Sequence, residues 1–99
     1  MAYLIFTTDK PDSETVRAKN RAAHYEFLEA HAGMLIASGG LQDDEATCFI
    51  GAAIILDCET REEADAFVAA DPFSTADLFE TVHIMRWEKA FFDGRRVSV

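Results

Sequence analysis

The sequence is short of positive charge. Its 99 residues carry nine Lys and Arg against eighteen Asp and Glu, for a formal net charge of −9. A nucleic-acid-binding protein needs a basic surface to neutralise phosphates, so this balance argues against nucleic acid as a partner, and it disfavours anionic membranes as well. No basic segment followed by a long apolar run opens the sequence, and no apolar stretch reaches the roughly 20 residues that cross a bilayer. We therefore expect a cytoplasmic protein that binds no membrane.

Cysteine and histidine are scarce too. Cys48 and Cys58 bracket one apolar strand pattern, and at the rise of an extended chain they are too far apart to form a disulfide. With three histidines and no paired His/Cys spacing, the sequence predicts no metal site. It also lacks a glycine-rich phosphate loop and a serine in a nucleophile-elbow context, and no residue pattern indicates haem or flavin. We expect no cofactor.

What the sequence does contain is an alternation of strand and helix patterns. Residues 2–8 and 49–58 are apolar on both alternating faces, which is typical of strands covered on both sides. Residues 34–41 form another strand pattern, which ends in a glycine pair. Residues 14–32 instead carry apolar side chains at helical spacing. Gly33 is placed to end that helix.

The second half of the chain repeats this alternation. A capping box at residues 60–63 opens a second helix that ends near residue 70. Residues 78–92 form the last and longest strand pattern, and residues 93–99 form a polar turn and a tail. The order β-α-β-β-α-β predicts one α+β domain over residues 1–99, a ferredoxin-like protomer with a four-stranded antiparallel sheet.

Two helices can cover only one face of such a sheet. Three of the four strand patterns are nevertheless apolar on both faces. The uncovered face would be an apolar patch larger than soluble monomers usually expose. We therefore predict a homodimer in which the two sheets pack face to face about a two-fold axis.

Two polar residues on the first helix are candidates for chemistry. His24 lies where the buried stripe meets the exposed face, and its side chain exchanges protons near neutral pH. A lone histidine on a helix is also commonly structural. Arg21 lies one turn earlier, where it either binds an anionic substrate group or pairs with a neighbouring acid.

Asp71 and the glycine pair also have two interpretations each. Asp71 precedes Pro72, which ends the second helix, so its carboxylate lies at the helix end where the dipole disfavours negative charge. It either needs a compensating partner or caps the next short turn. Gly39 and Gly40 either allow a bend in the strand or leave room for a ligand against bare backbone.

Taken in order, four segments resemble the YciI-like (YCII-related) family. They are Arg21-x-x-His24-x-x-Phe27-Leu28, Gly39-Gly40, Asp71-Pro72-Phe73 and Leu78-Phe79-Glu80-x-Val82. The resemblance extends from the first strand to about Phe92. It implies a dimeric α+β barrel of ferredoxin-like protomers, with His24 and Asp71 as the active-site pair. Where many members have a glycine soon after the Asp-Pro-aromatic segment, this sequence has Ala76-Asp77, which adds an acid near the expected pocket.

On this basis we expect a small enzyme that needs no cofactor. His24 acts as general base or acid and Asp71 orients it and stabilises its charge. Arg21, Gly39, Gly40 and Phe73 contact the small-molecule substrate in a cleft between sheet and helix. By analogy with other proteins of this fold, the reaction is elimination or isomerisation of a small cyclic or aromatic-derived acid. The alternative is a non-catalytic small-molecule-binding or assembly module with the same pocket.

Overall fold

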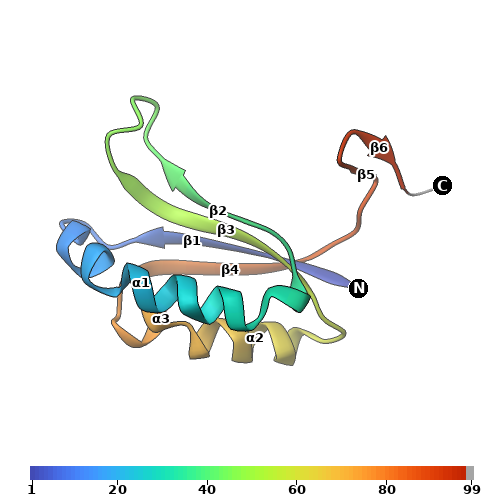
Figure 1. Cartoon of the computed structure of the whole chain (residues 1–99), viewed down its shortest axis with the longest axis horizontal. Coiled ribbons are helices and arrows are strands. Elements are labelled where there is room, and N and C mark those ends of the chain that lie inside the picture. The colour runs from blue at the N-terminus through green and yellow to red at the C-terminus, as the bar shows by residue number, and fades with distance from the viewer. Residues whose placement is uncertain (98–99) are drawn as a thin grey trace.

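A computed structural model describes residues 1–97 as a four-stranded sheet with helices on one face, followed by a small hairpin (Figure 1). In chain order the elements are β1 (Ala2–Asp9), α1 (Glu14–Ala30), the short 3₁₀ helix η1 (Ala32–Met34), β2 (Leu35–Gln42), β3 (Phe49–Asp57), α2 (Arg61–Ala70), α3 (Pro72–Thr75), β4 (Phe79–Trp87), β5 (Phe91–Phe92) and β6 (Arg95–Arg96).

The sheet has the strand order β2-β3-β1-β4, and all of its neighbouring strands are antiparallel. β1 and β3, which are apolar on both faces in the sequence, are its two central strands. Ile5 lies opposite Ile54 on one side and Ile84 on the other, which sets the register across three strands. This arrangement confirms the predicted α+β, ferredoxin-like class with a four-stranded antiparallel sheet.

The core lies between the sheet and the two long helices. Alternate residues of the central strands point to one face, and on the helix-covered face they are buried among side chains from both helices. The buried cluster comprises Tyr3, Ile5, Leu28, Ile54, Leu56, Cys58, Ala64 and Phe67. Burial of each large apolar side chain stabilises the fold by roughly 1.5–3 kcal/mol, so this layer fixes how α1 and α2 sit on the sheet.

The other sheet face has no helix over it. Leu4 lies opposite Ile55 and Met85, and Phe6 lies opposite Ala53, all on the face away from the core. Phe6 and Met85 are 37% and 52% exposed. We call these five residues the open sheet face.

The first helix ends earlier than predicted. α1 ends at Ala30, and Gly33 lies inside η1 rather than at a helix C-cap. The reason is a tightening of the backbone, because the His31 N–H donates to Leu28 O and the Met34 N–H donates to His31 O, which are the short-range hydrogen bonds of a 3₁₀ turn. β2 consequently begins at Leu35.

The last strand is shorter than predicted, and the expectation of one strand over residues 78–92 was wrong. β4 ends at Trp87 because Trp87 pairs with Ala2, the first residue of β1, and no neighbouring strand continues beyond it. The chain then forms the β5–β6 hairpin, whose turn residues Asp93 and Gly94 have φ of 53° and 76°. Such angles are those of the tight turns that join hairpin strands.

The predicted tail over residues 93–99 thus begins with this turn and β6, and its last two residues, 98–99, lie outside the described part of the chain. Within residues 1–97, no helix is both long enough and apolar enough to cross a membrane.

Candidate active site

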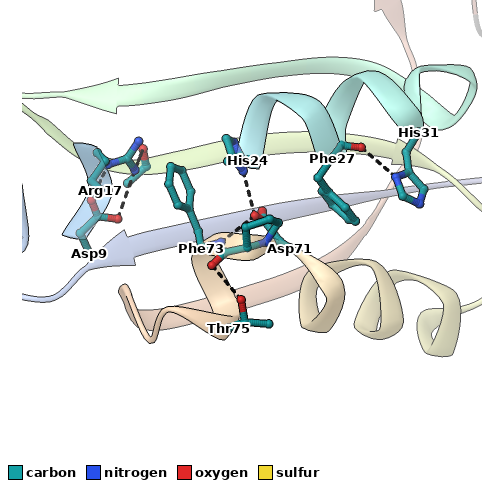
Figure 2. A network of polar contacts seen from close by, with 10 residues as sticks. Asp9, Arg17, His24, Phe27, His31, Asp71, Phe73 and Thr75 are labelled. Atoms are coloured by element: carbon teal, nitrogen blue, oxygen red, sulfur yellow. Dashed lines mark hydrogen bonds and ion pairs between the residues drawn. The ribbon is translucent and has the colours of Figure 1, made fainter. Parts of the chain in front are cut away.

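The site is centred on a buried contact between two segments that are distant in sequence. His24 on α1 and Asp71 at the junction of α2 and α3 are 7% and 3% exposed, and the His24 Nδ1 to Asp71 Oδ1 distance is 2.8 Å (Figure 2). The structure therefore brings together the two residues that the family resemblance paired.

Asp71 also caps α3. Its Oδ1 accepts a hydrogen bond from the Phe73 N–H at 2.9 Å, and Pro72 occupies the first turn of the helix. Proline is favoured there because its missing N–H would have no partner in the helix anyway. The two interpretations of Asp71 from the sequence thus hold at the same time, and the cap fixes the carboxylate that meets His24.

The partner of His24 determines which ring nitrogen is left for chemistry. An ionised carboxylate can only accept hydrogen bonds, so Nδ1 must carry the proton that is shared with Asp71. That leaves Nε2 as the nitrogen available to accept or return a proton. Among residues 1–97, no side chain or backbone group hydrogen-bonds to Nε2.

The Phe73 ring packs against the face of the His24 imidazole. The two rings stack with centroids 4.0 Å apart and an interplanar angle of 14°, and Phe73 is fully buried. Its amide binds Asp71 while its ring packs on His24, so one residue orients both members of the pair. Phe73 was predicted to contact substrate, and it does contribute to the pocket wall described below.

Arg17 contacts the opposite side of Phe73 and was not among the predicted site residues. Its guanidinium lies 4.9 Å from the Phe73 ring centroid. It also donates to both carboxylate oxygens of Asp9, at 2.7 and 3.2 Å, and to Gly51 O at 3.1 Å (Figure 2). The sequence carried one signal for it, since Arg17 is two turns before His24 on the same helical stripe.

A pocket of about 290 Å³ opens between α1 and the strands β2 and β3. One wall is the stripe of α1 that carries His24. The residues that line the pocket are Glu14, Arg17, Ala18, Arg21, His24, Tyr25, Leu28, Ser38, Gly39, Gly40, Thr47, Cys48, Phe49, Ala52 and Phe73. All the predicted site residues except Asp71 line this pocket. Asp71 does not line it but contacts His24, which does.

Arg21 lies exposed at the edge of this pocket. Its guanidinium lies over the rings of Tyr25 and Phe49, at 5.4 and 5.6 Å from their centroids. No acid of residues 1–97 forms an ion pair with it. Of its two interpretations from the sequence, pairing with a neighbouring acid is therefore not what the structure shows.

Gly39 and Gly40 have different roles in the pocket. A Cβ atom on Gly40 would lie 2.6 Å from Cδ1 of Phe49, so this glycine makes room for the Phe49 ring. A Cβ atom on Gly39 would meet nothing within 4 Å, and Gly39 contributes backbone to the pocket wall. Gly40 thus acts indirectly, by letting the Phe49 ring approach the backbone of β2.

The loop between β2 and β3 is fixed by Asp43. Its carboxylate accepts hydrogen bonds from the Thr47 amide at 2.7 Å, from the Thr47 hydroxyl and from the Cys48 amide at 3.4 Å. The hydrogen bonds from Thr47, led by its hydroxyl, lower the pKa of Asp43 below its usual value. This ionised carboxylate holds Thr47 and Cys48 in the pocket wall.

The remaining polar candidates lie outside the pocket. Asp77, the extra acid in the sequence, pairs with Lys10 at 2.5 Å and its side chain is 84% exposed. His31 donates through Nδ1 to Phe27 O at 2.8 Å, and its ring packs against Phe67. His83 lies beside Phe6 on the uncovered face of the sheet. Within residues 1–97 no three His, Cys, Asp or Glu side chains gather as metal ligands would.

Comparison with known proteins agrees with the fold. A model of the YCII-related domain matches residues 1–88. The curated proteins named Protein YciI from Escherichia coli O6:H1 and from Shigella flexneri are each 33% identical to this chain over 98 residues, which cover 92% of the chain and all of each relative.

A solved structure is similar over most of the chain. It is 5-chloro-2-hydroxyhydroquinone dehydrochlorinase (TftG) from Burkholderia phenoliruptrix AC1100, in complex with 2,5-dihydroxybenzoquinone. The TM-score is 0.83 at 32% sequence identity, and the match covers 89% of this chain and 94% of that one. By sequence and by structure, this chain belongs to the YCII-related domain family.

Proposed function

We propose that this protein is a small acid/base enzyme in which His24 transfers a proton at Nε2 while Asp71 orients the ring. The observation that carries this proposal is the buried contact of 2.8 Å between Nδ1 and Oδ1, with the same imidazole in the wall of a pocket. A structural histidine would not need to face a cavity. The dehydrochlorinase similar to this chain supports an enzymatic role.

The reaction class is elimination or isomerisation. His24 Nε2 takes a proton from the substrate, the electrons of that bond form a new double bond, and a leaving group departs as an anion with the electrons of its own bond. In an isomerisation the imidazolium returns the proton to a different atom instead. The Asp71 carboxylate stabilises the positive ring that forms between these steps. Every step uses groups of this chain, in keeping with the expectation that no cofactor is needed.

The substrate class is a small cyclic or aromatic-derived acid. A volume of about 290 Å³ suits a single ring with its substituents. Phe49 and Tyr25 offer flat apolar surfaces to such a ring, and the Arg21 guanidinium, which has no acidic partner within residues 1–97, is placed to bind its anionic group.

The test separates turnover from binding. The probes are 2,5-dihydroxybenzoquinone for binding by calorimetry and chlorinated hydroxyhydroquinones for release of chloride. We expect His24→Gln to lower turnover by about 10²–10⁴-fold, the usual contribution of a general acid or base, while the affinity for the dihydroxybenzoquinone changes little. If the wild type binds the probe but turns over no member of the series, the alternative of a non-catalytic binding module is the better one.

We propose in addition that two copies associate through the open sheet face, as the apolar pattern of the sequence predicts. The support is the exposure of Phe6 and Met85 on a face that no helix covers. A two-fold axis through this face buries both copies' apolar side chains at once. Sedimentation equilibrium at micromolar concentration checks it: we expect a dimer, and Phe6→Asp should yield a folded monomer. A wild-type monomer at that concentration would refute it.

A further inference from the structure

The C-terminal residues 88–97 form an arm that stands apart from the rest of the molecule. Figure 1 shows the β5–β6 hairpin away from the sheet and both long helices, beyond the end of β4. The hairpin exposes three apolar side chains, with Phe91 at 65%, Phe92 at 43% and Val97 at 51% exposed. The core side chains of the body are, by contrast, almost fully buried.

A hollow separates the root of this arm from the body of the same chain. It measures about 580 Å³ and is bordered by Met1, Ile36, Trp87, Lys89 and Val97. The arm is therefore not packed down onto β1 and β2. Its internal ties are the β5–β6 pairing and contacts such as the Lys89 ammonium 4.8 Å from the Phe92 ring centroid. An isolated two-stranded hairpin is only marginally stable in water, so an arm of this kind gains most by packing on another surface.

The charge of the arm indicates what that surface is. Residues 88–97 hold three of the nine Lys and Arg of the chain, at Lys89, Arg95 and Arg96, against Glu88 and Asp93, for a formal charge of +1. Residues 1–87 hold six Lys and Arg and sixteen acids, for a formal charge of −10. The arm thus carries a small net positive charge in an acidic chain, and it is electrostatically complementary to the body of a second copy.

We propose that the arm docks on the body of a second copy of this chain, with Phe91 and Phe92 as its apolar anchors and its basic residues facing the acidic surface of that copy. Arginine is one of the residue types that dominate the binding energy of interfaces, and Phe is enriched in them relative to the rest of the surface. The inference rests on the proposed homodimer, whose contact the arm extends beyond the open sheet face. The exchange is reciprocal, because a two-fold axis gives each copy the other's arm.

The test uses the full chain. Sedimentation equilibrium gives the dimer dissociation constant of the wild type, of Phe91→Ser/Phe92→Ser and of Arg95→Glu. We expect the double variant to weaken the dimer on the order of tenfold or more, as truncation of aromatic anchors does. Arg95→Glu should weaken it more than Lys19→Glu, a change of equal charge at an exposed position on α1. The wild-type constant should also rise with salt, whereas that of Arg95→Glu should rise less.

A second measurement locates the contact. In a dimer mixed from isotope-labelled and unlabelled copies, filtered NOE spectra report only contacts between copies, and we expect them from the Phe91 and Phe92 rings. If the wild type is dimeric but these NOEs are absent and the double variant associates normally, the arm proposal is wrong while the sheet-face dimer stands. If the wild type is monomeric, both fail.

Discussion

Replacing Asp71 by Asn and by Ala distinguishes the contribution of its negative charge from that of its hydrogen-bond acceptors. In the wild type, Oδ1 accepts from both the His24 ring and the Phe73 amide, and Oδ2 has no hydrogen-bond partner within residues 1–97. Asn retains an oxygen at the first position and places its NH₂ at the second, where no donor opposes it. Ala removes both acceptors and leaves a buried Nδ1–H without a partner.

These contacts set the expected magnitudes. Asp71→Asn exchanges a charge-assisted hydrogen bond for a neutral one, a loss of about 1 kcal/mol. Asp71→Ala loses the cap, worth about 1 kcal/mol, and leaves the buried imidazole donor unsatisfied, which costs about 1–3 kcal/mol more. We therefore expect the free energy of unfolding to fall by about 1 kcal/mol in the first variant and by about 2–4 kcal/mol in the second.

Urea denaturation followed by circular dichroism measures both values. Asp65→Asn and Asp65→Ala are the matched controls, because Asp65 forms only an exposed ion pair with Arg61 on α2, and such pairs contribute less than about 1 kcal/mol. In the proposed reaction, both Asp71 variants should turn over more slowly than the wild type, since neither stabilises the imidazolium. If Asp71→Ala is as stable as the wild type, or if Asp71→Asn keeps full turnover, the role assigned to this carboxylate is wrong.

Three further substitutions test contacts that stabilise the fold around the site and in the core. Gly51→Ala should destabilise the fold by about 1–3 kcal/mol or more, because its Cβ would lie 2.0 Å from a backbone oxygen of β1. Gly39→Ala, which has open space around it, should change the stability little. Thermal unfolding compares the two variants. Arg17→Met should cost about 3–5 kcal/mol by leaving the buried Asp9 carboxylate unpaired, and adding Asp9→Asn should recover part of that loss in a double-mutant cycle. Burial, assisted by the charges of neighbouring acids, raises the pKa of the Cys58 thiol, so the folded state keeps this proton to a higher pH than the unfolded state. The free energy of unfolding should therefore fall as the pH rises above the ordinary thiol value of 9.0. The fall should be smaller in Cys58→Ala.

The sequence by itself determined the order and class of the elements. Apolar alternation on both faces marks β1 and β3 as central strands. The predicted Thr60 cap is confirmed by the Glu63 N–H donating to the Thr60 hydroxyl at 3.2 Å, although the Glu63 carboxylate accepts from that hydroxyl and not from the Thr60 N–H. These signals are local, because they depend on side chains at fixed spacing along one segment. The ends of elements depend on neighbours instead. β4 stops at Trp87 only because β1 begins at Ala2, which no pattern within residues 78–92 records.

The site divides in the same way. Sequence chemistry singled out His24 and Asp71 and left open whether Asp71 caps or pairs, and only the packing of α1 against α3 shows that one oxygen does both. Arg17 was missed because its importance comes from Asp9 and Phe73, which lie on other elements. Local sequence specifies which groups are present and on which face of an element they lie. Only the tertiary structure decides which of those faces meet, because that depends on long-range packing of the whole sheet and both helices.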